Sequence, residues 1–112
     1  MSKAIEDVIA ERIRQVEVEG WTEKYDDTHD AGELASAAAS YALNASCILY
    51  PMDGVGFGNS PPLFWTWAKS WWKPTTPRRD LVKAAALIIA EIERIDRGTK
   101  KEIESGSGGE KT

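Results

Sequence analysis

The sequence is poor in the residues that build covalent and metal-centred chemistry, because its 112 residues include one cysteine and one histidine. The single cysteine, Cys47, excludes an intramolecular disulfide, so a reducing compartment fits the chain best. The single histidine, His29, excludes a metal site with two histidines from one chain and argues against a zinc hydrolase. Cys47 lies in an apolar run and His29 among acids, so no Cys–His or Ser–His–Asp set is indicated.

Long hydrophobic runs are missing as well. The apolar run at residues 84–92, which contains Glu91, is much shorter than the roughly 20 residues that a membrane-spanning helix needs. The beginning of the chain carries scattered charges and lacks the uninterrupted apolar stretch of a signal peptide. We therefore expect a cytoplasmic protein without a membrane partner.

Positive charge is also in short supply, since 14 Lys and Arg residues face 18 Asp and Glu residues, giving a net charge of −4. Such a chain repels nucleic-acid phosphates, which argues against generic nucleic-acid binding. A chain of 112 residues is expected to form one domain with a core of limited size. Helical proteins of this kind often complete their core by pairing with a second copy, so a homodimer is predicted.

Helical periodicity predicts an all-α fold, a compact bundle whose three long helices cover residues 3–19, 30–49 and 77–97. Residues typical of helix ends flank these segments: Ser2, Asp30 and Thr76 at the starts, and Gly20 and Gly98 after the ends. The aliphatic residues of the first helix, Ile5, Val8, Ile9, Ile13 and Val16, share one side. The second helix is rich in alanine, which allows another helix to approach closely, so it is predicted to be the central packed helix.

The remaining segments are predicted to be irregular or short. Residues 22–28 are polar without a period, and residues 50–62 contain three glycines and three prolines that break regular structure. The tryptophan-rich segment 63–73 is predicted to form a short helix or an aromatic turn. Residues 99–112 lose apolar content, so we expect a disordered tail after a single domain at 1–98.

Side chains of the metal-ligand type are densest at the predicted start of the second helix, where Asp26, Asp27, His29, Asp30 and Glu33 lie. Asp30 and Glu33 are one helical turn apart, so their carboxylates can share a face. Oxygen ligands in this pattern suit Mg²⁺ or Mn²⁺. The helix dipole alone also favours acids at such a position and explains Asp27 and Asp30 equally well. Glu33 is more indicative, because it precedes an alanine-rich helix that is expected to be buried.

Basic and aromatic residues offer candidate contacts to a nucleotide. Arg78 and Arg79 lie in the first turn of the last helix, where free backbone amides can receive a phosphate, although a solvated helix start explains them equally well. Trp71 and Trp72 have polar neighbours and could stack on a base, while packing is the favoured role for such rings. For His29 a surface hydrogen bond is favoured over catalysis.

The chain resembles small uncharacterised proteins of phages and bacterial prophages in the segments ERIRQ, EGWTEKYDDTHDAGELASAAASYA, WWKP and RRDLVKAAALIIAEIERIDR. It also resembles, more distantly, the MazG-like all-α nucleotide pyrophosphohydrolases, whose ExxE and ExxD motifs bind Mg²⁺ and a nucleoside triphosphate. The segment HDAGELASAAASYA is similar to the first motif helix, with Asp30 and Glu33 in the ExxE positions. In the second motif Asp80 and Lys83 stand where that family has Glu and Asp, and a lysine does not bind magnesium.

This resemblance implies a nucleoside triphosphate pyrophosphohydrolase that works in a bacterial host cell with Mg²⁺ or Mn²⁺. Asp30, Glu33 and Asp80 would hold the metal, and Asp27 and Glu33 would take the catalytic roles, with Asp27 orienting the attacking water. The expected nucleotide contacts are Arg78, Arg79, Lys83, Trp71, Trp72 and His29. Two alternatives stay open: a non-catalytic phage protein that binds a nucleotide or blocks a host defence, and an acidic adaptor for a protein partner.

Overall fold

The structure of the protein, a computed structural model, describes residues 1–50 and 54–104, and within them all regular structure is helical. The elements are α1 (Lys3–Glu17), α2 (Glu23–Asp27), α3 (Glu33–Leu49), the 3₁₀ helix η1 (Lys69–Trp71) and α4 (Pro77–Glu104). The predicted all-α class is therefore confirmed. No helix of the described ranges combines the length and apolar content needed to cross a membrane.

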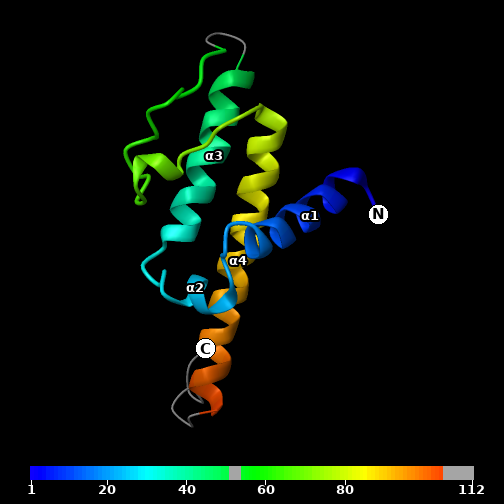
Figure 1. Ribbon diagram of the computed structural model, residues 1–112, viewed down its shortest axis with the longest axis vertical. Helices are drawn as coiled ribbons and strands as arrows, with labels where there is room; N and C mark the ends of the chain where they lie inside the picture. Colours follow the sequence, from blue (N-terminus) through cyan, green and yellow to red (C-terminus); the bar gives the residue numbers. More distant parts are fainter. Residues whose placement is uncertain (51–53, 105–112) are drawn as a thin grey trace.

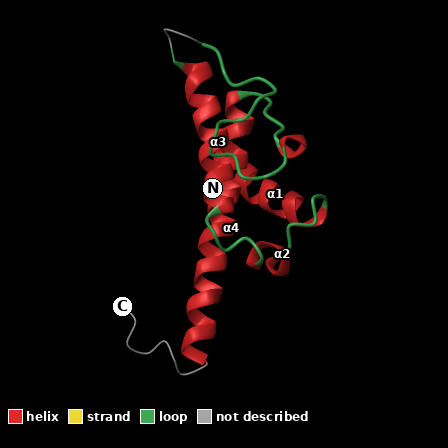
Figure 2. Ribbon diagram, turned by 90° about the vertical axis from the view of Figure 1, so that its left-hand side faces the viewer, coloured by secondary structure: helices red, strands yellow, loops and turns green. Residues whose placement is uncertain are grey.

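Helices α3 and α4 run antiparallel, side by side, and form the centre of the molecule (Figure 1). Helix α1 lies across the middle of α4, and α2 lies near the start of α3. The segment between α3 and α4 folds back along α3 (Figure 1). In Figure 2 this segment, α2 and most of α1 lie on one side of the α3–α4 pair. The long helices thus share α4 as their common support.

The core between α3 and α4 is built from small side chains. Alanines of both helices are buried, namely Ala37, Ala38 and Ala45 on α3 and Ala84, Ala86 and Ala90 on α4. Leu34 and Leu87 are fully buried beside them, and the rings of Trp21, Trp65 and Trp72 fill the remaining space. Alanine lets two helix backbones approach closely, so α3 packs tightly on α4. The central helix is nevertheless α4, which also contacts α1 and α2, so the prediction that α3 would be central is wrong.

The side of α1 that faces the core is opposite to the side that its sequence pattern suggests. Its buried residues are Glu11 and Gln15, whereas Ile5, Ile9 and Ile13 are 52%, 44% and 51% exposed. The sequence pattern identifies the apolar side of this helix but does not say whether that side meets the core. The polar residues are buried because partners from other elements reach them.

The connection from α1 to α3 contains a helix that the sequence did not indicate. Helix α1 ends at Glu17 and not at Glu19, and Gly20 adopts a left-handed conformation with φ of 77°. Trp21 then folds back, donating its backbone amide to the carbonyl of Gln15 at 2.9 Å. Thr22 caps α2 by accepting from the backbone amide of Tyr25. Helix α2 has five residues, which is too short for an apolar period to be visible.

Helix α3 starts three residues later than predicted, and Asp30 is not its cap. Its N-cap is Gly32, in the left-handed conformation with φ of 84° and without a side-chain cap. The Glu33 carboxylate instead accepts a hydrogen bond from the Ala31 backbone amide at 2.8 Å. The left-handed Gly32 turns the chain between Asp30 and Glu33, so the two do not share one helical turn.

Helix α4 begins as predicted but ends later. Thr76 accepts from the backbone amide of Arg79, which confirms it as the cap in front of Pro77. The helix continues through Gly98 to Glu104, so the predicted end before Gly98 and the predicted disorder at 99–104 are wrong. One glycine costs a helix only about 1 kcal/mol, which the Lys and Glu residues that follow it in sequence can offset. Residues 105–112 of the predicted tail lie outside the described residues.

Candidate ligand-binding site

The predicted acidic cluster separates into structural ion pairs. Asp26 is fully buried and accepts from Arg12 at 2.8 Å, which ties α2 to α1. Burial raises the pKa of Asp26, and the charge and hydrogen bond of Arg12 do not fully offset it. Asp27 pairs with Arg97 at 2.7 Å and ties α2 to α4. The proposed water-orienting role of Asp27 therefore competes with an arginine that already holds its carboxylate.

The remaining predicted metal ligands lie apart. Asp30 is exposed, and the pKa of Glu33 is lowered by hydrogen bonds from its own backbone amide and that of Ala31. Asp80 is fully buried and accepts from Asn44 Nδ2 at 2.9 Å and from the Thr75 amide at 2.8 Å. Asn44 lies about three turns along α3 from Glu33, roughly 16 Å at the rise of an α-helix.

Asp30, Glu33 and Asp80 therefore do not converge, and the predicted Mg²⁺ or Mn²⁺ site is not assembled. Over residues 1–50 and 54–104, no group of three or more His, Cys, Asp or Glu side chains is placed to hold a metal ion. The residues present do not fit the metal centre that the resemblance to the pyrophosphohydrolases implies.

Several predicted nucleotide contacts are also engaged within the protein. Arg78 pairs with Asp7 at 2.9 Å and Arg79 pairs with Glu11, so both arginines fasten α4 to α1. His29 Nδ1 lies 3.1 Å from the Tyr25 carbonyl, in agreement with the favoured hydrogen-bonding role. Trp72 is only 6% exposed and donates its indole N–H to the Gly58 carbonyl at 2.8 Å, so it has the favoured packing role and is not placed to stack on a base.

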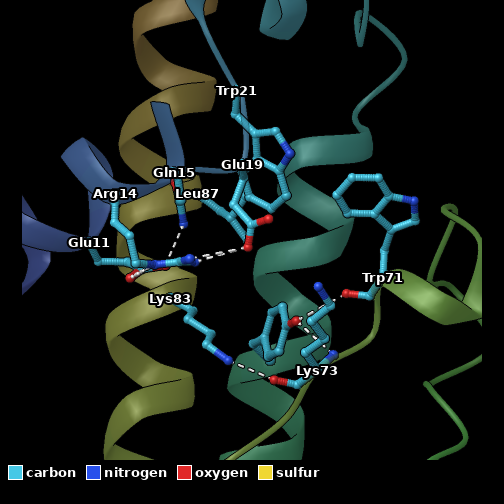
Figure 3. A pocket seen from close by; sticks show the side chains of 10 residues that line it. Glu11, Arg14, Gln15, Glu19, Trp21, Trp71, Lys73, Lys83 and Leu87 are labelled. Carbon is cyan, nitrogen blue, oxygen red and sulfur yellow. Dashed lines mark hydrogen bonds and ion pairs between the residues drawn. The ribbon is translucent and has the colours of Figure 1, made fainter. Parts of the chain in front are cut away.

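Two predicted nucleotide contacts, Lys83 and Trp71, come together at a cavity between α1, α3 and α4 (Figure 3). Its volume is about 30 Å³, and its other lining residues are Glu11, Arg14, Gln15, Glu19, Trp21, Tyr41, Lys73 and Leu87. In Figure 3 the α1 side chains face Trp71 and Lys73 across this space, with Trp21 and Lys83 completing the ring. We call this space the central cavity.

One wall of the central cavity is a buried carboxylate held by arginines. Arg14 binds both oxygens of Glu11, at 2.8 and 2.9 Å, and also reaches Glu19 at 3.2 Å. Gln15 Nε2 donates to Glu11 at 3.3 Å, and Arg79 contacts it from α4. Burial raises the pKa of Glu11, but the hydrogen bonds and charges of Arg14 and Arg79 outweigh it, so the pKa lies below its ordinary value.

The opposite wall carries ammonium groups. Lys83 Nζ donates to the Lys73 carbonyl at 2.6 Å and lies 5.3 Å from the centre of the Tyr41 ring. Burial lowers the pKa of Lys83, because it disfavours the charged form. Lys73 Nζ lies 5.8 Å from the Trp71 ring centre. In the part of the chain that the structure describes, no carboxylate forms an ion pair with Lys73 or Lys83.

Two residues of the lining also carry polar atoms that protein groups leave unsatisfied. Gln15 Oε1 and Trp21 Nε1 are both buried and have no hydrogen-bond partner among the described residues. Buried polar atoms are nearly always paired with protein, ordered water or a ligand. Both atoms are enclosed by protein, so the groups that the cavity surface offers to a ligand are the two ammonium groups.

Sequence reasoning found Lys83 and Trp71 but missed the rest of this lining. Glu11 and Gln15 are four residues apart, a spacing that places them on one side of a helix. This spacing was the available signal for a polar buried side of α1. The isoleucines on another side of the helix gave a stronger signal for an apolar buried side. No protein family model, no curated protein sequence and no solved structure matches the chain.

Proposed function

We propose that the protein binds a small phosphorylated molecule of the nucleotide class in the central cavity, without hydrolysing it through a bound metal. The observation that carries this proposal is the pair of ammonium groups, Lys73 and Lys83, that line a partly open polar cavity without forming an ion pair to a carboxylate. Lys73 is exposed, but Lys83 is half-buried and burial disfavours its charged form, so a counter-charge beside it would be favourable. An anionic ligand supplies it.

The donors of the central cavity suit phosphate oxygens. Lys73 and Lys83 can both donate, and an anion beside Lys83 would stabilise the charged form that burial disfavours. The phosphate of a nucleotide would supply such an anion.

The aromatic side of the cavity supports a planar group on the same ligand. Trp71 lines the cavity and is 40% exposed, so its ring connects the buried space with the surface. Its ring centre lies 6.3 Å from that of Trp21, with 39° between the planes. Because the enclosed volume is small, the phosphate would enter it while a base stacks on Trp71.

Metal-dependent hydrolysis has weaker support, since it needs carboxylates that converge on one cation. The expected ligands Asp30, Glu33 and Asp80 are separated along α3 and α4, and Lys83 stands in place of a further acid. The proposal therefore follows the non-catalytic alternative, in which a chain related to nucleotide hydrolases keeps binding without turnover.

Calorimetric titration with inorganic phosphate and with adenine and guanine mono- and triphosphates, each with and without Mg²⁺, tests this proposal. We expect binding that does not need Mg²⁺ and that weakens about tenfold or more in Lys83→Met, because a charged hydrogen bond contributes roughly 1.5–3 kcal/mol. Lys69→Gln is the matched control, since Lys69 is exposed on η1 and does not line the cavity. Trp71→Ala should weaken nucleotides but leave inorganic phosphate unchanged.

Two results would overturn the proposal. One is the absence of binding by any of these anions at millimolar concentration, and the other is equal affinity in wild type and Lys83→Met. Release of pyrophosphate that requires Mg²⁺ would instead favour the hydrolase. A circular dichroism spectrum of Lys83→Met that matches wild type separates lost binding from lost folding.

A further inference from the structure

Most of the isoleucine side chains of this protein lie outside its core. Isoleucine is among the residue types most often buried in proteins, yet none of the isoleucines at 5, 9, 13, 48, 88, 89, 92 and 95 is buried. Six of them, Ile5, Ile9, Ile13, Ile88, Ile92 and Ile95, are between 44% and 52% exposed. All six are on α1 or α4, so the exposed apolar area is concentrated on two helices.

The exposed residues of α4 follow a heptad pattern. Leu81, Ala85, Ile88, Ile92 and Ile95 recur at alternating steps of four and three residues, which is the spacing of a coiled-coil seam. The seam spans about 21 Å of helix. It lies on the side of α4 opposite to the buried Ala86 and Ala90, so α3 does not cover it. In Figure 2 the side of the α3–α4 pair away from the loop and α2 carries no other described element.

Helix α1 continues this apolar surface. Ile5, Val8 and Ile9 line a shallow hollow together with Ile89 of α4, and Val8 also borders Leu81. Leu81 and the six half-exposed isoleucines leave an apolar area on the order of 600 Å², close to the roughly 800 Å² that each partner buries in a standard dimer. An apolar patch of this size is at the upper end of what monomeric proteins expose.

Several charged groups beside the patch are paired within the chain. Asp7 is held by Lys3 and Arg78, at 3.1 and 2.9 Å, and Arg12 lies 3.6 Å from Glu93. A charged partner would have to compete with these internal pairs. A heptad seam of aliphatic residues is complementary to another such seam, and a second copy of the chain presents one.

We propose that a second copy of this chain covers the α1–α4 face, with the two α4 seams packed against each other about a twofold axis. Ile88 lies at the middle of the seam and meets its own copy whether the two helices run parallel or antiparallel. This inference is independent of the ligand, because the seam and the central cavity share no residue.

Sedimentation equilibrium of the full chain, from 1 µM to 1 mM, tests this proposal. We expect wild type to be a dimer, and Ile88→Glu combined with Ile92→Glu to be a monomer with unchanged helical circular dichroism. Leu63→Glu is the control and should remain a dimer, because Leu63 is a fully exposed loop residue. Monomeric wild type over the whole range would overturn the proposal, and so would a glutamate double variant that is dimeric.

Cross-linking gives a second readout that does not depend on a destabilising charge. In a Cys47→Ser background, Ile88→Cys should form a disulfide-linked dimer on mild oxidation, since the two Cα atoms at the twofold axis come within about 7 Å. Leu63→Cys should form at least tenfold less of it. Equal cross-linking at the two positions would contradict the proposed seam. Lys83→Met should dimerise as wild type does, which keeps failure of the ligand proposal separate from failure of the dimer.

Discussion

Helix α4 packs against two long helices, α3 and α1, and these are held by different physical forces. Helix α3 packs on it through buried alanines and leucines, where the favourable free energy comes from removing apolar surface from water. Helix α1 contacts it through ion pairs, with Arg79 on Glu11, Arg78 on Asp7 and Arg12 near Glu93, in addition to an apolar contact at Val8. The apolar side of α1 faces away from the core. The comparison indicates that the α3–α4 contact contributes most of the stability of the fold, while ion pairs determine the position of α1.

The largest effect is expected where the apolar contact is broken. Leu87 is fully buried against α3, so Leu87→Ala should lower the free energy of unfolding by about 2–5 kcal/mol through lost burial and an unfilled cavity. Chemical denaturation followed by tryptophan fluorescence measures this change. Leu63→Ala, at an exposed loop position, should change stability by less than about 0.5 kcal/mol. A loss at Leu87 no greater than that of the control would show that α3 and α4 do not form the stabilising centre.

A smaller effect is expected where the charged contact is broken. Glu11→Gln keeps the shape of the side chain but leaves Arg14 and Arg79 without their buried counter-charge, at a cost of about 2 kcal/mol. Glu17→Gln is the matched control, because Glu17 is exposed on the same helix. Urea denaturation at pH 7 should show a loss only in the first variant.

Low pH should reduce the difference in stability between wild type and Glu11→Gln. The pKa of Glu11 in the folded protein lies below its ordinary value of 4.5, so its contribution is complete above pH 4.5 and is lost as the pH falls through the folded value. Wild type should therefore approach Glu11→Gln in stability below that range. A gap that stays constant between pH 7 and pH 3 would mean that the charge of Glu11 does not hold α1 in place.

The same contrast explains how much of the fold could be predicted. Local signals were sufficient for the three long helices, since Ser2 and Thr76 are caps and the alanines of α3 indicate close packing. The buried side of α1 could not be predicted from its period. Glu11 is buried because Arg79, far along the chain, approaches it in the fold. The local sequence gives no signal for such a long-range pair.

The site was predicted in part for the same reason. Lys83 and Trp71 were expected to contact a nucleotide, and both line the central cavity. The acids from Asp26 to Glu33 are close in sequence, but two of them are taken up by arginines of α1 and α4. Proximity along the chain predicted a cluster, whereas in the fold Asp26 and Asp27 pair with different arginines and Asp30 is exposed.

The smallest change in stability is expected at the end of α4. There the local sequence suggests that the helix stops, whereas in the structure it continues. Gly98 lies inside the helix, its φ is not positive, and a Cβ added there meets no atom within 4 Å. Gly98→Ala should therefore raise the free energy of unfolding by up to about 1 kcal/mol and increase the helical circular dichroism signal. If Gly98 ended the helix in the left-handed conformation, as its sequence context suggests, the same change would instead cost about 1 kcal/mol, because alanine is strained there. The sign of this one measurement decides whether α4 stops at Gly98 or continues beyond the contacts that α1 and α3 make with it.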